Sequence, residues 1–168
     1  MKTPVFLLAA LLAAPILRAA DTIPNPQIDY AAFQKIVQTS AGERESHRLT
    51  EDAFLTAMKE PGVVVLDART ASRYDMRHIK GAVNLPFTEF AAAPLATVIP
   101  GKDTKILIYC NNNFQGDQSA FISKVPSASL NLSTYTSLKS YGYTNIYELG
   151  PLLNVNTTKI PFEGTATK

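Results

Sequence analysis

The sequence predicts an α/β fold in which an open, mostly parallel sheet is flanked by helices on both faces. Two runs of consecutive apolar residues, at 63–66 (VVVL) and 106–109 (ILIY), are typical of parallel strands that are buried on both faces. Segments with helical patterns lie between the predicted strands, and this alternation indicates βα units. The length of 168 residues and the hydrophobic content of 46% suit one domain with one core.

The first elements of the domain are predicted to be helical. Residues 21–28 are polar and rich in proline, so we expect a spacer there. Asp29 is a suitable N-cap for the helix that follows. One face of this helix carries Tyr30, Phe33, Ile36 and Val37. The polar residues 39–48 are expected to form a loop, and Thr50 is expected to cap a second helix.

The remaining strands and helices are shorter or less apolar. Residues 82–85 and 145–149 are predicted as strands, because each is a short run that contains β-branched or aromatic residues. Residues 88–98 and 130–141 show helical patterns, and Gly142 is a suitable stop for the second of these helices. These segments complete the alternation of strands and helices.

Residues 1–19 (MKTPVFLLAALLAAPILRA) have the pattern of a secretory signal peptide. Lys2 precedes an apolar run that is short for a membrane span, and an uncleaved membrane anchor is the alternative. We therefore expect an exported protein, in the bacterial periplasm, with no membrane span once the signal peptide is removed. The predicted organisation is a signal peptide at 1–19, an N-terminal spacer and helix at 20–48, the α/β domain at 49–153 and a C-terminal tail at 154–168.

Cys110 is the only cysteine, and its position is the most informative feature of the sequence. It directly follows the predicted strand at 106–109, and ligands of open parallel sheets bind at the carboxyl ends of strands. The polar loop that it opens begins with Asn111, Asn112, Asn113, Phe114, Gln115 and Gly116. Backbone N–H groups of a tight loop around the sulfur would favour a thiolate or a persulfide. The alternative, from position alone, is a small buried apolar side chain, since free cysteines are often buried.

Three blocks of the sequence, in the right order, resemble a rhodanese-like domain, the sulfurtransferase fold. The first block is LDAR at 66–69 followed by Tyr74, the second is HIKGAVNLP at 78–86, and the third is IYC at 108–110. After them, YGYTNIYEL at 141–149 resembles the step of that family into its last strand. The resemblance extends over roughly the whole predicted α/β domain.

The resemblance implies that Cys110 is the catalytic residue and cycles between a thiol and a persulfide. A small sulfur donor, such as thiosulfate or a persulfide, would supply the sulfur, and a thiol or cyanide would accept it. Backbone amides of residues 111–116 would hold the transferred sulfur. Asp67 and Arg69 match family positions beside the site, where an ion pair or hydrogen bonds to the loop backbone would support it.

The sequence departs from the family pattern after Cys110. The helix at 130–141 begins much later than the short loop of the family allows, and residues 115–127 form an insertion. A short helix capped by Asp117 would place a helix N-terminus next to the sulfur. The loop has no Arg or Lys, so we expect weak activity with thiosulfate or a different donor. Gly116 stands where related phosphatases need an arginine, which argues against phosphatase chemistry.

Two other functions fit the same residues. A rhodanese-like binding module, weakly active or inactive, would use the insertion to contact a protein partner, and an exported redox-sensing thiol would keep Cys110 reactive. No cofactor or metal is expected, because His47 and His78 are the only histidines and no cofactor motif occurs. The formal net charge of +2 gives no basic footprint for a nucleic-acid partner.

Overall fold

Five parallel strands form the central sheet of the protein. A computed structural model describes residues 23–167 of the chain. The strand order is β1 (Arg48–Leu49), β7 (Ile146–Leu149), β5 (Ile106–Tyr109), β2 (Val64–Asp67) and β4 (Val83–Asn84). Each neighbouring pair in this sheet is parallel. The mostly parallel sheet predicted from the sequence is confirmed, and its two most apolar strands, β5 and β2, lie side by side.

The carboxyl ends of the strands lie along one edge of the sheet. Asp67 of β2 is in register with Tyr109 of β5, and Ile108 of β5 is in register with Glu148 of β7. Cys110 directly follows β5, so it lies at the edge where open parallel sheets bind their ligands.

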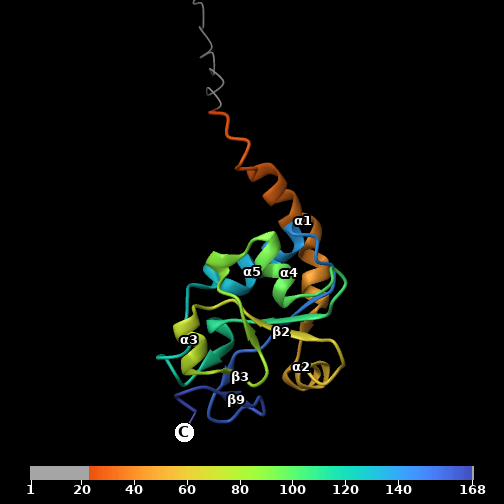
Figure 1. The fold of residues 1–168 in the computed structure, drawn as a ribbon. Coiled ribbons are helices and arrows are strands. Elements are labelled where there is room, and N and C mark those ends of the chain that lie inside the picture. Colours follow the sequence, from red (N-terminus) through yellow and green to blue (C-terminus); the bar gives the residue numbers. More distant parts are fainter. Residues whose placement is uncertain (1–22, 168) are drawn as a thin grey trace, which may run out of the picture.

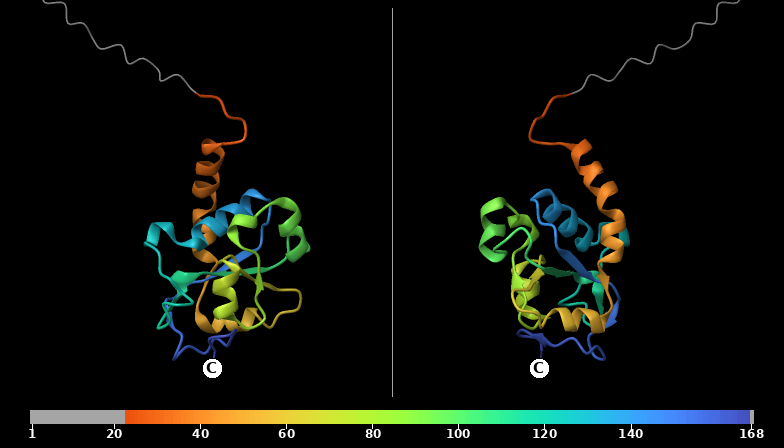
Figure 2. Two further views of the ribbon diagram at one scale, coloured as in Figure 1. Left: turned by 60° about the vertical axis from the view of Figure 1, so that its left-hand side comes forward. Right: turned by 90° about the vertical axis from the view of Figure 1, so that its right-hand side faces the viewer.

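Helices cover both faces of the sheet, as predicted. On one face, α2 (Glu51–Ala57) packs through Phe54. On the opposite face, α4 (Ala92–Val98) packs through Leu95, next to α5 (Leu130–Ser140). Figures 1 and 2 show α4 and α5 on one side of the strands and α2 on the other. Successive residues of a strand point to opposite faces, so each central strand contributes to both cores.

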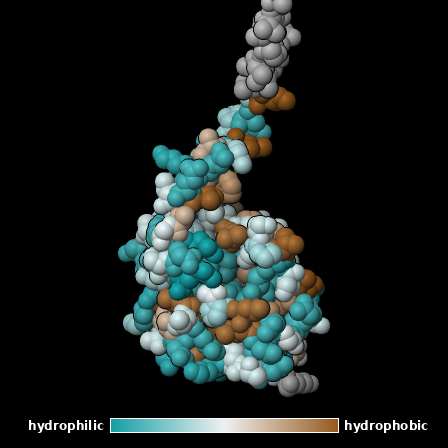
Figure 3. Space-filling view, turned by 180° about the vertical axis from the view of Figure 1, so that it is seen from behind, coloured by the Kyte–Doolittle hydropathy of each residue, from teal (hydrophilic) through white to brown (hydrophobic). Residues whose placement is uncertain are grey.

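The first helix, α1 (Tyr30–Ser46), is longer than predicted, because it continues to Ser46 through most of residues 39–48, which we expected to form a loop. That prediction was wrong because contacts with the domain stabilise the second half of the helix. Ser40 is buried there, and Glu43 Oε2 lies 2.9 Å from Lys139 Nζ of α5. The first half of α1 stands out from the rounded body (Figure 3).

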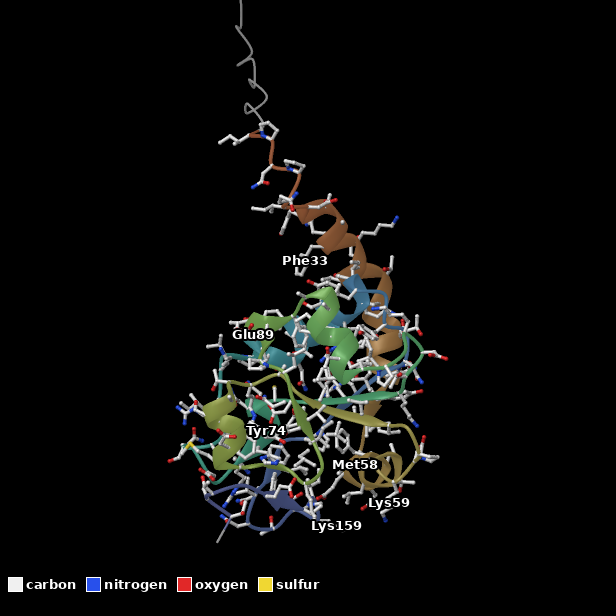
Figure 4. All side chains as sticks on the ribbon, in the orientation of Figure 1. Phe33, Met58, Lys59, Tyr74, Glu89 and Lys159 are labelled. Carbon is white, nitrogen blue, oxygen red and sulfur yellow. The ribbon has the colours of Figure 1, made fainter. Side chains whose placement is uncertain are left out.

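The C-terminal residues pack on the domain. β9 (Phe162–Glu163) pairs antiparallel with β3 (His78–Ile79), and β8 (Leu153–Asn154) pairs parallel with β6 (Phe114–Gln115). Lys159 lies below α2 in Figure 4, with its Nζ 2.8 Å from a carboxylate oxygen of that helix. The stretch that we described as a tail is therefore part of the folded body.

Two helix caps were predicted correctly, and two short helical elements differ from the prediction. Asp29 and Thr50 cap their helices as predicted, since each side chain accepts a hydrogen bond from the backbone N–H three residues later. The helix predicted at 88–98 consists of a 3₁₀ turn, η1 (Phe87–Glu89), followed by α4. The short helix α3 (Ala71–Met76) was not predicted, because it is brief and buries no residue.

The predicted signal peptide at 1–19 lies outside the residues that the structure describes. Within residues 23–167, no helix combines the length and the apolar character that a membrane crossing requires. Export of the protein therefore stays a prediction.

Candidate active site

Cys110 lies at the end of β5, beside a pocket of about 380 Å³. Only 1% of the residue is exposed, and its Sγ is 3.4 Å from Ser129 Oγ. The pocket is lined mainly by polar side chains from α1, β1, β7, the loop after β5 and the start of α5. These side chains include Arg44, Arg48, Asn112, Asn113, Asn131 and Glu148. The sulfur is thus buried at the wall of a polar pocket.

The N-terminal end of α5 lies next to Cys110. Ser129 immediately precedes this helix, and its side chain makes no capping hydrogen bond to it. The hydroxyl is instead within hydrogen-bond distance of Cys110 Sγ. The insertion therefore leaves the sheet edge and returns to it. The start of α5, which carries a partial positive charge, lies close to the sulfur.

At Asp117, where we expected a short helix, the insertion forms a single turn. Asp117 Oδ1 accepts hydrogen bonds from the N–H groups of Ser119 and Ala120 at 3.1 and 3.0 Å, and the chain then leaves the helical path. Phe121 follows and is fully buried in the core. Burial of this ring turns the chain inward, which ends the turn before a helix can form.

A ring of backbone amides around the sulfur was expected, and one backbone N–H, that of Asn113, is directed to the sulfur. Asn111–Asn113 form a 3₁₀ turn, η2, in which this N–H also donates to the carbonyl oxygen of Cys110. The next N–H group, that of Phe114, donates to the Asn111 carbonyl. The physical reason is the full burial of Phe114, which directs the chain away from the sulfur and into β6.

Asn112 and Asn113 are the loop residues that line the Cys110 pocket, and both connect the loop to its surroundings. Asn113 Oδ1 accepts a hydrogen bond from the Cys110 N–H at 2.8 Å, and its Nδ2 donates to the Leu149 carbonyl at 2.6 Å. The Asn112 side chain both donates to and accepts from the backbone of Lys124 in the insertion. These bonds fix the shape of the loop.

The other four predicted loop residues face elsewhere. Asn111 lines a separate cavity of about 410 Å³, and Phe114 lies in the core. Gln115 and Gly116 lie against the C-terminal residues, where a Cβ on Gly116 would be only 2.8 Å from Asn154 Oδ1. The structure therefore brings two of the six predicted loop residues to the pocket of Cys110.

Two arginines that the sequence analysis did not single out line the Cys110 pocket. Arg44 of α1 and Arg48 of β1 both bind Glu148 of β7: Arg44 Nη2 lies 2.6 Å from Glu148 Oε1, and Arg48 Nε lies 3.3 Å from it. Burial raises the pKa of the Glu148 carboxyl, although both arginines act in the opposite direction. The pocket thus contains cations that the loop lacks. Their spacing gives no signal of this, because Arg44 lies on α1 and Arg48 lies on β1.

Asp67 and Arg69, the predicted supporting residues, form a buried ion pair outside the Cys110 pocket. Arg69 Nε is 3.0 Å from Asp67 Oδ1, and Arg69 Nη1 donates to the Ala120 carbonyl at 3.0 Å. Burial alone would lower the pKa of Arg69, but its bonds to Asp67 raise it. The Tyr109 hydroxyl also donates to Asp67, and burial raises the pKa of Tyr109 well above its usual value. This network joins two strand ends to the insertion.

Both histidines make structural contacts, and neither lines the Cys110 pocket. His47 Nδ1 lies 3.0 Å from the Ile146 carbonyl oxygen. His78 stacks on the Tyr74 ring, and its Nε2 lies 3.2 Å from Glu163 Oε1. Among residues 23–167, no group of three or more His, Cys, Asp or Glu side chains is placed to hold a metal ion.

The fold and the site define a thiol-containing α/β domain, with one cysteine at the end of a central parallel strand and a helix start beside its sulfur. The chain belongs to the rhodanese-like domain family, because the model of that family matches residues 50–150. The matched stretch contains Cys110 and the Asp67–Arg69 pair, and it confirms the resemblance seen in the sequence.

Curated proteins with related sequences include an enzyme of sulfur transfer. Thiosulfate sulfurtransferase PspE from Escherichia coli (strain K12) is 27% identical over 95 residues, which are 56% of this chain and 76% of PspE. A tRNA uridine(34) hydroxylase from Aster yellows witches'-broom phytoplasma (strain AYWB) is 28% identical over 104 residues, which are 60% of this chain. The match covers only 29% of the hydroxylase, so this likeness concerns one part of a longer protein.

Solved structures share the fold at low sequence identity. The BH2092 protein from Bacillus halodurans has a TM-score of 0.53 and 17% identity, over 79% of this chain and 88% of that one. The rhodanese-like domain of the Alr3790 protein from Anabaena sp. has a TM-score of 0.51 and 20% identity, over 71% of this chain and 80% of that one. These likenesses confirm the α/β fold.

Proposed function

We propose that the protein is an exported sulfurtransferase that carries sulfane sulfur as a persulfide on Cys110. The observation that carries this proposal is the position of the Cys110 sulfur, at the end of β5, 3.4 Å from Ser129 Oγ and at the wall of a polar pocket. Membership of the rhodanese-like family and the likeness to PspE support sulfurtransferase chemistry in general.

The proposed cycle consists of two displacements at sulfur. The Cys110 thiolate attacks the outer sulfur of a donor such as thiosulfate, so that an Sγ–S bond forms while the S–S bond of the donor breaks and sulfite leaves with the electron pair. A thiolate or cyanide acceptor then attacks the outer sulfur of the persulfide, and the Cys110 thiolate leaves. Both steps conserve charge and need no oxidant.

Several groups around Cys110 favour negative charge on sulfur. The Asn113 N–H is directed to Sγ, the Ser129 hydroxyl is within hydrogen-bond distance, and the start of α5 adds its partial positive charge. Arg44 and Arg48 bring formal positive charge to the same pocket, which attracts an anionic donor. Glu148 neutralises part of that positive charge. We therefore propose organic sulfur anions as donors in addition to thiosulfate.

Because Cys110 is buried, the reaction requires a local change in structure that admits the donor. The residue is 1% exposed, so a donor reaches the sulfur only when the pocket wall moves. Pro126 of η3 (Pro126–Ala128) and Leu152 form part of this wall, and Leu152 is 58% exposed. We expect these parts of the wall to open, because both residues are exposed.

The test is catalysed sulfur transfer by the purified protein. With thiosulfate or an organic persulfide as donor and cyanide as acceptor, the wild type is expected to form thiocyanate, and Cys110→Ser is expected to show only the uncatalysed rate. Ser119→Ala, an exposed change within the insertion, is the control and retains the rate. Thiocyanate formation that does not depend on Cys110, or none with either donor, would remove the proposal.

A binding module without sulfur transfer is the second candidate, and the near-complete burial of Cys110 favours it. In such a module the exposed insertion residues would contact a partner; Ile122 and Val125 are 47% and 67% exposed. Iodoacetamide labelling of the native protein distinguishes this module from a protein that has a reactive thiol. Labelling only after denaturation supports the binding module, and rapid labelling without sulfur transfer from any donor supports a redox-sensing thiol.

The export proposal concerns residues 1–19 and has its own test. After expression of the full chain in bacteria, the protein recovered from the periplasmic fraction is expected to lack these residues in an intact-mass measurement. Recovery of the uncleaved chain in the membrane fraction would instead support the membrane anchor.

A further inference from the structure

The first half of α1 stands outside the body of the protein, and almost none of it is buried. Of residues 30–39, all are exposed except Ile36, which is half-buried. Figures 2 and 4 show this half of α1, with Phe33 on it, clear of the other elements. Isolated helices shorter than about 12–15 residues are only marginally stable in water, and packing of one face is what usually stabilises them. Contacts outside the single chain would therefore stabilise this part of the helix.

One face of α1 carries a row of residues with the spacing of a seam between two helices. The row consists of Tyr30, Phe33, Val37, Ser40 and Arg44, which alternate between steps of three and four positions. In the second half of the helix this row faces the domain, because Ser40 is buried and Arg44 binds a carboxylate of β7. In the first half the row is apolar and open: Tyr30, Phe33 and Val37 are 68%, 48% and 44% exposed. The open half thus continues a face that already packs inside the molecule.

A groove of about 600 Å³ lies beside this row, between α1 and α5. Phe33 and Val37 line the groove from α1, and Leu132 and Tyr135 line it from α5. Its charged lining residues are one arginine and one glutamate of α1, so the groove has no net charge. An uncharged, largely apolar helix face is therefore the surface that fits it.

The same surface contains both the exposed apolar row and the groove that can receive it. An interface between two identical chains has this property, because each copy presents the same patch. The domain already covers the row in the second half of α1, so two α1 helices can pair only in antiparallel directions, with the two bodies at opposite ends. In such a pair centred at Lys35, Phe33 of each copy lies opposite Val37 of the other.

The exposed apolar area is large enough for such an interface. A whole aromatic side chain has about 150–250 Å², so the exposed parts of Ile28, Tyr30, Phe33 and Val37 amount to roughly 400–500 Å² in each copy. With the lining of both grooves, a dimer that covers them buries about 1,000 Å² in total, the size at which specific interfaces begin. A lipid surface fits this face less well, because Lys35 is the only Lys or Arg between Tyr30 and Glu43.

We propose that two copies of this chain form an antiparallel dimer through α1, in which the first half of each helix lies in the groove between α1 and α5 of the other copy. The groove shares Arg44 and Leu132 with the pocket of Cys110, so the second copy covers one side of that pocket. The inference does not depend on sulfur transfer, since it concerns a surface on which the proposed chemistry makes no demand.

The first experiment measures the dissociation constant of the dimer by sedimentation velocity over a range of concentrations of the purified chain. Val37→Asp is expected to raise this constant at least about a hundredfold, because the dimer would bury two unpaired carboxylates. Gln38→Asp is the matched control: it adds the same side chain to the same half of α1, at an exposed residue that does not line the groove, and should keep the wild-type constant. A wild type that is monomeric at every soluble concentration, or a dimer that Val37→Asp does not weaken, would overturn the inference.

A mixing experiment tests which residues face each other. Phe33→Lys alone is expected to weaken the dimer as Val37→Asp does. When the two variants are mixed, they are expected to form a heterodimer, because one lysine then faces one aspartate and the second contact between Phe33 and Val37 is intact. This rescue also shows that both variants are folded. Failure of the mixture to dimerise would contradict the antiparallel pair, since parallel helices place residue 33 opposite residue 33.

Two further measurements distinguish other occupants of the exposed face. If the wild type is monomeric in solution but sediments with vesicles of phosphatidylethanolamine and phosphatidylglycerol, and Val37→Asp does not, the face binds a lipid surface and the inference fails. If removal of residues 1–22 abolishes the dimer, that segment forms the contact and the inference fails as well. Loss of sulfur transfer in a wild type that still dimerises would remove the proposed function and leave the dimer in place.

Discussion

Ser129 Oγ lies 3.4 Å from Cys110 Sγ although the two residues are 19 positions apart. Asn113 explains how the start of α5 stays at the sulfur. Its side-chain oxygen accepts hydrogen bonds from the Cys110 N–H at 2.8 Å and from Asn131 Nδ2 of α5 at 3.0 Å. The loop and the helix are thus joined directly, whatever the length of the chain between them.

The contact between Ser129 and Cys110 predicts a catalytic effect of the hydroxyl. Ser129→Ala is expected to slow persulfide formation on Cys110 about tenfold, because a hydrogen bond to a charged group contributes roughly 1.5 kcal/mol or more. The measurement is the single-turnover rate with excess sulfane donor. Ser119→Ala serves as the control, and equal rates in the two variants would contradict a role for the Ser129 hydroxyl.

The contacts of Asn113 predict a structural role as well. Asn113→Ala removes the acceptor of two buried hydrogen bonds and the donor to the Leu149 carbonyl, so we expect a loss of at least about 2 kcal/mol in the free energy of unfolding. Urea denaturation measures this loss. The control is Asn145→Ala, which removes one exposed hydrogen bond to a carbonyl. A loss as small as that of the control would show that Asn113 does not hold the loop.

The hydrogen bonds of the Tyr109 hydroxyl predict that removal of this hydroxyl destabilises the fold. It donates to Asp67 and accepts from the Ile79 N–H at 3.1 Å, and both partners are buried. Tyr109→Phe leaves the Ile79 N–H without a partner and removes one of the hydrogen bonds to Asp67, so it is expected to lower the free energy of unfolding by about 1–3 kcal/mol. Tyr141→Phe, which removes an exposed hydrogen bond to the Phe90 carbonyl, should change it by about 0.5 kcal/mol or less. Similar effects of the two changes would argue against the buried network.

The contacts of the Glu163 carboxylate, in β9, predict that the stability of the fold depends on pH. The Gly81 N–H donates to it at 3.0 Å and His78 lies beside it, and these contacts lower the pKa of Glu163 below its usual 4.5. A carboxyl with a lowered folded-state pKa stabilises the fold above its usual pKa, and the contribution is lost as the pH falls through the lowered value. Between about pH 5 and pH 3, urea midpoints of the wild type should therefore fall more steeply than those of Glu163→Gln. Urea midpoints that fall equally steeply in the two proteins would show that these contacts do not lower the pKa of Glu163.

Much of the fold was predictable because local patterns and tertiary packing agree in it. The apolar runs of β2 and β5 have one stable environment, between two layers of helices, and the caps Asp29 and Thr50 act locally. The second half of α1 was not predictable from its polar sequence. Its helical state depends on partners far along the chain, namely Lys139 and Glu148.

The candidate site was predictable only in part for the same reason. The position of Cys110 at a strand end follows from the strand alone. The environment of the sulfur depends on the burial of Phe114 and Phe121, which redirects the loop and ends the turn after Asp117. Arg44 reaches the pocket because α1 packs beside α5, and Arg48 because β1 pairs with β7, so no local pattern around Cys110 indicates them.

The most direct measurement of the central claim is the intact mass of the protein after incubation with a sulfane donor and removal of excess reagent. The account predicts an adduct of about +32 Da, one sulfur atom, on the wild type, its loss when a thiol acceptor is added, and no adduct on Cys110→Ser. A wild-type protein that stays at its original mass with thiosulfate, a thiosulfonate and an organic persulfide would contradict persulfide transfer through Cys110.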